Sequence, residues 1–170
     1  ERCAPTINRF LSHQDPKVKA AAIAGLIRYG GLEGILISAS ALKEMIESGS
    51  PEQRKNAAVV LGLIKIQSFH QSVLKLMDDR DPEVRRQGAA AAGELGSPEL
   101  LPRLLELLGD GYVHSTAVKA LSRRGAEILD DLVKLYENPA SNRMQRLGAV
   151  KTLASIRSQE AFDALIKALP

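Results

Sequence analysis

The side chains able to carry chemistry are few in this 170-residue chain, and they lie far apart. Its three histidines are His13, His70 and His114. The single cysteine, Cys3, excludes an internal disulfide and any metal site built from several cysteines. The adjacent carboxylates of Asp130 and Asp131 would point about 100° apart on a helix, so they would not converge on one substrate. We therefore expect no enzyme activity, no cofactor and no metal site.

The chemistry that does recur is a helix-capping residue followed four positions later by a basic one. The pairs are Asp15/Lys19, Ser50/Arg54, Asp81/Arg85, Asp110/His114 and Asn142/Arg146. Asp, Ser and Asn are good N-caps, and such a cap stabilises a helix by roughly 0.5–2 kcal/mol, against about 0.2–0.5 kcal/mol for an i,i+4 ion pair. We expect each capping residue to begin a helix and each basic residue to reach a cap or a carbonyl in the adjacent repeat.

The capped segments read as amphipathic helices, with apolar residues three and four positions apart. We expect these capped helices over residues 16–29, 51–65, 82–95, 112–124 and 141–156. The most regular copy is Asp81–Leu95, in which Pro82 fits the first helical position and a run of four Ala lets a neighbouring helix come close.

A second set of helices is predicted between the capped ones. They include Ala41–Ile46, Ser72–Met77, Leu100–Leu108, Ile128–Tyr136 and Ala161–Ile166, with Ile7–Leu11 as partner of the first capped helix. The stretch from Gly30 to Ser40 is irregular, and Ile35–Ile37 within it is either a short extra helix or a loop that packs on the core.

A two-helix unit of about 30 residues cannot bury its apolar faces alone, so neighbouring units must stack. The predicted fold is therefore all-α, an alpha-alpha superhelix or solenoid of about five helix pairs, forming a single domain over residues 1–170. The chain begins without Met and its last residues, Lys167–Pro170, still read as a core helix. We expect it to be a fragment of a longer protein whose array continues beyond Pro170.

The pattern of Asp81, Pro82, Val84 and Arg85, followed by Ala and by Gly93-x-Leu95, resembles HEAT repeats. More narrowly, it is similar to the short HEAT-like class known from phycobilin lyases. This resemblance implies a right-handed superhelix whose capped helices line the concave side, and a role in binding rather than a fixed activity.

The resemblance also extends to HEAT-like enzymes, but their catalytic residues are missing. HEAT-like hydroxylases bind iron through His-Glu pairs, whereas here Gln14, Gln71 and Ser115 follow the three histidines. HEAT-like DNA glycosylases use aromatic residues, Trp prominently, beside an Asp, and this chain has no Trp. The family implies a scaffold here and not either of these enzymes.

Charge is distributed unevenly over the predicted elements. The capped helices hold 14 Lys and Arg against 3 Asp and Glu, a net charge of +11, so the rest of a chain of net charge +3 carries −8. The cations that point away from the apolar side are Lys17, Arg28, Lys55, Arg86, Lys119, Arg123 and Lys151. These seven are the candidate partner-binding residues of a basic concave face.

Three interpretations of this basic face stay open. It is a solvated surface without a partner, it binds an acidic segment of a protein or of another domain of the same chain, or it binds nucleic acid. Aromatic residues make up only 4% of the chain, which weakens recognition of single strands by stacking. A lyase-type chromophore scaffold or a regulatory module rests on analogy alone. We interpret the chain as a protein-binding scaffold, without a membrane span and located in the cytoplasm.

Overall fold

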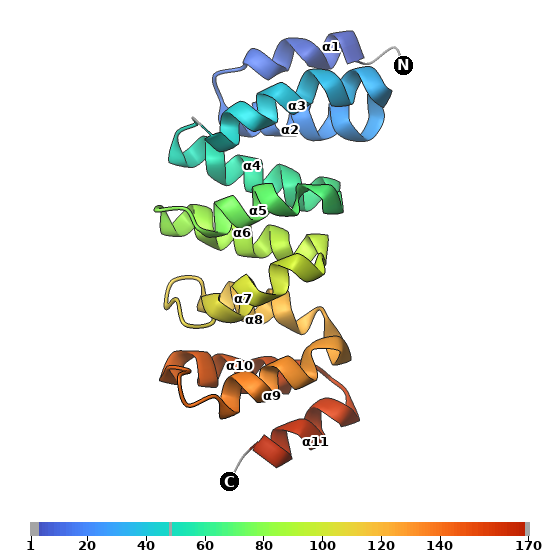
Figure 1. Cartoon of the computed structure of the whole chain (residues 1–170). Helices are drawn as coiled ribbons and strands as arrows, with labels where there is room; N and C mark the ends of the chain where they lie inside the picture. The colour runs from blue at the N-terminus through green and yellow to red at the C-terminus, as the bar shows by residue number, and fades with distance from the viewer. Residues whose placement is uncertain (1–3, 48, 169–170) are drawn as a thin grey trace.

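The computed structural model describes residues 4–47 and 49–168, which form helices and short connections stacked in one direction (Figure 1). Cys3, Leu169 and Pro170 lie outside the described residues. The helices are α1 Ala4–Asn8, η1 Arg9–Ser12, α2 Pro16–Tyr29, α3 Gly31–Glu47, α4 Pro51–Ile64, η2 Gln67–Phe69, α5 His70–Met77, α6 Pro82–Leu95, η3 Pro98–Leu100, α7 Leu101–Leu107, α8 His114–Ser122, η4 Gly125–Ile128, α9 Leu129–Glu137, α10 Arg143–Ser155 and α11 Gln159–Ala168. The all-α solenoid expected from the sequence is confirmed.

The predicted capping residues begin their helices. The side chain of Asp15 accepts a hydrogen bond from the backbone N–H of Lys17, and Asp81 accepts from Glu83 and Val84. At α4 and α10 the cap is reciprocal, because a Gln three residues into each helix also accepts from the backbone of the Ser or Asn cap. Each of these caps satisfies backbone donors that the first helical turn leaves free.

The fourth capped helix starts later than expected. Asp110 does accept hydrogen bonds from the backbone of Tyr112 and Val113, but α8 begins only at His114. Gly111 stands here where three other copies have Pro, and Gly favours a turn over the first helical position.

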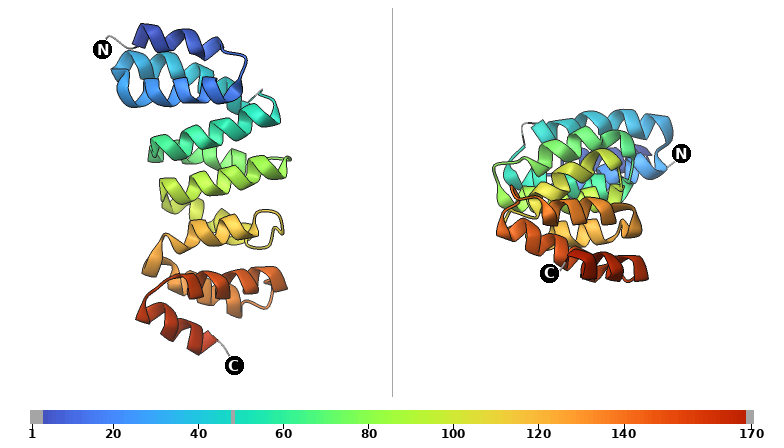
Figure 2. Two further views of the ribbon diagram at one scale, coloured as in Figure 1. Left: turned by 180° about the vertical axis from the view of Figure 1, so that it is seen from behind. Right: turned by 60° about the horizontal axis from the view of Figure 1, so that its bottom comes forward.

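The helices form two layers. The capped layer consists of α2, α4, α6, α8 and α10, and the outer layer of the helices between them. Figure 1 looks onto the outer layer, and the left view of Figure 2 looks onto the capped layer. The two termini lie at opposite ends of the stack.

Successive helices of the capped layer pack closely, because small residues meet there. A Cβ on Gly93 of α6 would lie 2.8 Å from both Cα and Cβ of Ala120 in α8, and one on Gly62 of α4 would lie 3.3 Å from Cα of Ala91 in α6. In the outer layer, the backbones of α5 and α7 approach each other at few or no points, and the same is true of α7 and α9. Long side chains bridge this wider spacing, as Arg103 of α7 does by pairing with Asp78 at the end of α5. Closer packing on one side bends a stack toward that side, which places the capped layer on the inside.

The core is one continuous cluster of buried apolar side chains that extends from α2 to α11. Leu, Ile, Val and Ala dominate it, as the low aromatic content requires. The single domain over residues 1–170 and the continuation of the array stay predictions.

Of the two alternatives for Ile35–Ile37, the helical one is correct, but the residues belong to the long helix α3, which runs unbroken from Gly31 to Glu47, and not to a short extra helix; the expected irregularity is wrong. Its glycines mark a close crossing of α2 and α3: a Cβ on Gly30 or Gly34 would lie within 2.6 Å of the carbonyl oxygen of Leu26. Gly31, at φ +61°, makes the turn between the two helices. Ile35 and Leu36 are exposed on α3, so this segment does not pack on the core as a loop.

Candidate functional site

The basic residues of the capping pattern connect adjacent repeats. Three of them reach a carboxylate 25 residues further along the chain. Lys19 lies 3.6 Å from Glu44, Arg54 contacts Asp79, and Arg85 donates to Asp110 over 3.0 Å. Only Asp110 is itself a capping residue of the next capped helix. The other two carboxylates belong to α3 and to the turn that precedes Asp81.

The contact between Arg54 and Asp79 is the most enclosed of the three. Two guanidinium nitrogens donate to the two carboxylate oxygens over 2.5 and 2.9 Å, and the side chains are only 11% and 9% exposed. Burial raises the pKa of Asp79, but the hydrogen bonds from Arg54 and from the backbone of Asp81 outweigh it and hold the pKa below its ordinary value. This carboxylate is therefore charged and has a structural role.

At the last two capped helices, α8 and α10, the basic residue of the capping pattern makes a different kind of contact. His114 is buried, and its Nδ1 lies 2.8 Å from the carbonyl oxygen of Leu108, while Nε2 has no hydrogen-bond partner among the described residues. Arg146 donates to the carbonyl oxygens of Asn138 and Pro139. Both side chains hydrogen-bond to the turn before their own helix, and neither has a hydrogen bond or ion pair to the adjacent repeat within residues 4–47 and 49–168.

The seven predicted binding residues all belong to the capped layer, and three of them already have a carboxylate partner there. Lys55 pairs with Glu52, Arg86 with Glu83 over 2.7 Å, and Arg123 with Glu94. The hydrogen bond from Lys55 lowers the pKa of Glu52, and the hydrogen bond from Arg86 lowers the pKa of Glu83.

The other four are exposed, and none has an ion pair within the described ranges. They are Lys17, Arg28, Lys119 and Lys151. The guanidinium of Arg28 lies 5.7 Å from the ring centroid of Tyr29, and this aromatic contact is neutral, so the charge of Arg28 is not balanced within the described residues. The exposed surface of the capped layer, called here the capped face, is thus basic, but less so than a count of its cations predicts.

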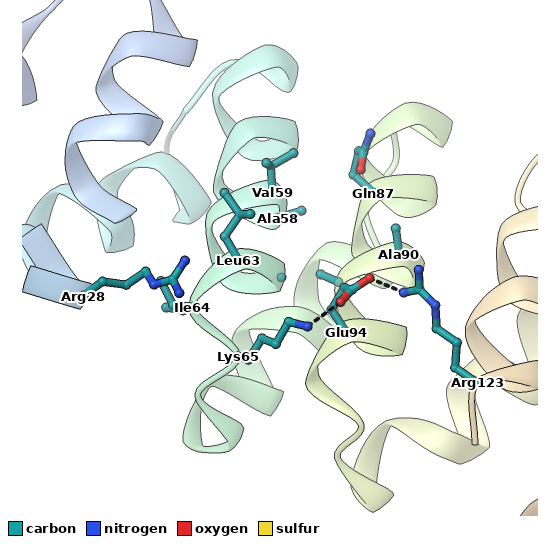
Figure 3. A pocket seen from close by; sticks show the side chains of 12 residues that line it. Arg28, Ala58, Val59, Leu63, Ile64, Lys65, Gln87, Ala90, Glu94 and Arg123 are labelled. Atoms are coloured by element: carbon teal, nitrogen blue, oxygen red, sulfur yellow. Dashed lines mark hydrogen bonds and ion pairs between the residues drawn. The ribbon is translucent and has the colours of Figure 1, made fainter. Parts of the chain in front are cut away.

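A groove of about 730 Å³ lies on the capped face between α4 and α6 (Figure 3). Its apolar lining includes Val59 and Leu63, which are 39% and 51% exposed, and the small residues Ala58, Ala90 and Ala91. Large apolar side chains at these positions do not contribute to the core, so they offer surface to another molecule.

Charged side chains stand around this apolar lining. Arg28, from α2, lies at one side of the groove. Arg123, at the end of α8, lies at the other side (Figure 3). Glu94 lies between Lys65 and Arg123, with its carboxylate 2.8 Å from the Lys65 ammonium and in contact with the Arg123 guanidinium. The hydrogen bonds from Lys65 and Arg123 lower the pKa of Glu94.

The structure thus brings only Arg28 and Arg123 of the predicted residues together at this groove. Val59, Leu63, Lys65 and Glu94 also line the groove and were not among the residues predicted from the sequence. An aligned set of repeats carries the signal for Val59, because the matching position holds an exposed Lys in two other capped helices, Lys119 in the fourth and Lys151 in the fifth. A large apolar residue at an outward position favours contact with a partner.

No group of three or more metal-binding side chains occurs in the described part of the chain. His13 accepts a hydrogen bond through Nδ1 from the backbone of Asp15, and His70 contacts the carbonyl oxygen of Gln67 and the amide of Gln71. These two histidines serve local structure. Within residues 4–47 and 49–168, every helix also falls short of the length and hydropathy needed to cross a bilayer.

Comparisons with known proteins agree with this architecture. The profile of HEAT repeats matches residues 38–122, and that of the PBS lyase HEAT-like repeat matches residues 145–169. The crystal structure of an engineered protein from the Northeast Structural Genomics Consortium is 21% identical, with a TM-score of 0.52 over 97% of this chain and 84% of that one. At this identity the likeness concerns the fold alone. No curated protein matches the chain.

Proposed function

Because this chain belongs to the HEAT repeat family, whose repeats generally serve as protein-interaction scaffolds, we propose that it is a non-catalytic scaffold that binds an acidic segment through its capped face. The segment belongs to another protein or to another domain of the same chain. The observation that carries this proposal is the set of exposed capped-face cations that form no ion pair with a carboxylate among the described residues. Lys17, Lys119 and Lys151 are three of these, and they come from three different repeats.

Several features favour a protein segment over nucleic acid as the partner. Glu52, Glu83 and Glu94 interrupt the cations of the capped face, so a partner must place its negative charges at intervals; a peptide can put neutral residues opposite these glutamates, whereas the phosphates of a nucleic acid follow one another without gaps. The apolar groove offers contacts that a protein side chain can use and a phosphate cannot. Tyr112, an aromatic residue near this face, already donates its hydroxyl to Glu83 over 3.1 Å.

A triple charge reversal tests the proposal. In the face variant, Lys17, Lys119 and Lys151 are each replaced by Glu; all three are exposed, so we expect the helical content to be unchanged. The control reverses Lys43, Lys75 and Lys134, which are exposed on the outer layer and give the same change in net charge. The probe is a phage-displayed library of random dodecapeptides.

We expect the natural chain and the control variant to enrich acidic peptides, and the face variant to lose them. Peptides that bind all three forms equally would contradict the proposal. So would tighter binding of duplex DNA, with a steep dependence of log affinity on log salt.

The match to the PBS lyase HEAT-like repeat supports a lyase-type chromophore scaffold as a second candidate. Binding of a bilin to the purified chain, followed through the absorbance of the bilin, would favour it. The same titration with the triple face variant would show whether the capped face is involved.

A further inference from the structure

We propose that the groove between α4 and α6 binds a partner segment in which one large apolar side chain is flanked on both sides by carboxylates. The inference rests on the proposed function, because it names the chemistry of the acidic segment. It adds two things to that proposal. It places the partner segment in the groove, and it gives the segment an apolar side chain, which a basic surface alone would not select.

The lining of the groove accounts for the apolar anchor. Val59 and Leu63 are one helical turn apart on α4, so their side chains lie next to each other along the groove (Figure 3). Ala90 of α6 lies across the groove from them and leaves space, since its side chain does not extend beyond Cβ. The volume of about 730 Å³ is within the range of small-ligand sites and accommodates a Leu-sized or Phe-sized side chain with adjoining backbone.

The charges around the groove account for the flanking carboxylates. On one side, Arg28 has no anionic partner among the described residues. On the other side, Glu94 is shared by Lys65 and Arg123, which leaves one positive charge in excess. A segment with a carboxylate on each side of its apolar residue would match both excess charges (Figure 3).

The probe is the fluorescein-labelled peptide Gly-Ser-Glu-Glu-Leu-Glu-Glu-Ser-Gly, titrated with the chain and followed by fluorescence anisotropy. One control peptide has Ser in place of Leu, and a second has Gln in place of every Glu. The protein variants are Leu63→Ser, inside the groove, and Leu147→Ser, a matched control on α10 that is 44% exposed and does not line the groove. Circular dichroism checks the fold of each variant.

We expect Leu63→Ser to weaken binding about tenfold, and the Ser peptide to weaken it by a similar factor with the natural chain. Leu147→Ser leaves the affinity unchanged. Because Leu63 and the peptide Leu are expected to touch, the two changes together should cost less than the product of the separate effects.

A charge exchange tests the flanking carboxylates. The Arg28→Glu variant should bind the original peptide more weakly. It should bind more tightly a peptide in which the two Glu on one side of Leu are replaced by Lys. Loss without any such preference would overturn the proposed role of Arg28.

The failure of this inference is distinguishable from failure of the proposed function. Suppose the peptide binds, and binding falls when Lys17, Lys119 and Lys151 are reversed, but neither Leu63→Ser nor the Ser peptide matters. The groove is then not the site, while the basic scaffold stands. If neither this peptide nor any acidic peptide from the library binds, both proposals are overturned.

Discussion

At the scale of single residues, Gly93 shows how the local preference of a residue and its packing can oppose each other. An Ala in a helix is ordinarily more stable than a Gly by up to about 1 kcal/mol. At Gly93, however, the added Cβ would lie 2.8 Å from Ala120 on the neighbouring helix. Gly25, on α2, has nothing within 4 Å of the same added atom, so it provides the contrast.

We therefore expect replacement by Ala at Gly93 and at Gly25 to change the free energy of unfolding in opposite directions. Gly93→Ala should lower the free energy of unfolding by about 1–2 kcal/mol, because α6 and α8 must move apart. Gly25→Ala should raise it by about 0.5–1 kcal/mol. Urea unfolding followed by circular dichroism measures both. Equal effects at the two positions would show that the α6–α8 contact does not limit the spacing of the capped helices.

At the scale of elements, the Arg54–Asp79 pair connects α4 to the turn between α5 and α6. The folded-state pKa of Asp79 is below its unfolded value. The pair therefore contributes its full stability above the unfolded pKa, and that contribution is lost as the pH falls through the folded pKa.

When this carboxylate is removed, we expect the free energy of unfolding to depend less on pH in the acid range. Asp79→Asn should destabilise the chain by roughly 1–3 kcal/mol at neutral pH, because Arg54 keeps its charge in a largely enclosed position. The difference from the natural chain should shrink as the pH is lowered through the acid range where Asp79 protonates. Thermal melts over a pH series measure this, and a difference that is independent of pH would argue against the ion pair as its cause.

Element boundaries were predictable where a capping side chain marked them, and less so elsewhere. Asp15, Ser50, Asp81 and Asn142 each cap the helix expected of them. The glycines before Ser40 were interpreted as a break, although they serve a close helix crossing. The spacing of two helices depends on the residues of both, so a local pattern cannot distinguish these two uses of Gly.

The candidate site was predictable only in part for a related reason. The basic residues of the capped helices could be identified by periodicity, but Lys55, Arg86 and Arg123 proved to be paired with Glu52, Glu83 and Glu94. The first two pairs lie three residues apart on one helix, so spacing alone could have revealed them. The pair of Arg123 with Glu94 joins two helices and required the stacking of α6 on α8.

At the scale of the whole molecule, stability in a stack comes from each repeat and its junctions with its neighbours. The junctions from α2 to α8 each have an ion pair that starts at Lys19, Arg54 or Arg85. The junction between α8 and α10 has His114 in the corresponding place, with its Nδ1 at the carbonyl oxygen of Leu108 and no carboxylate partner in the described structure.

We therefore expect the chain to open first at its C-terminal end. Amide hydrogen exchange followed by mass spectrometry should show faster exchange in α9, α10 and α11 than in α4 and α6, with α2 at the opposite end as the comparison. Addition of urea at a concentration below the unfolding transition should increase this difference in exchange rate. Equal protection of α2 and α10 would indicate that the junctions are energetically equivalent.

The contacts of Gly62 with Ala91 and of Gly93 with Ala120 also limit how the molecule can deform. Backbone already meets side chain there, so the capped layer resists further compression, whereas the backbones of α5, α7 and α9 are farther apart and are separated by side chains that can repack. Bending is consequently one-sided: the stack resists a tighter curve and yields toward a straighter one. A partner too large for the groove could widen it by straightening the stack. The elastic cost of straightening would be shared among all the repeats.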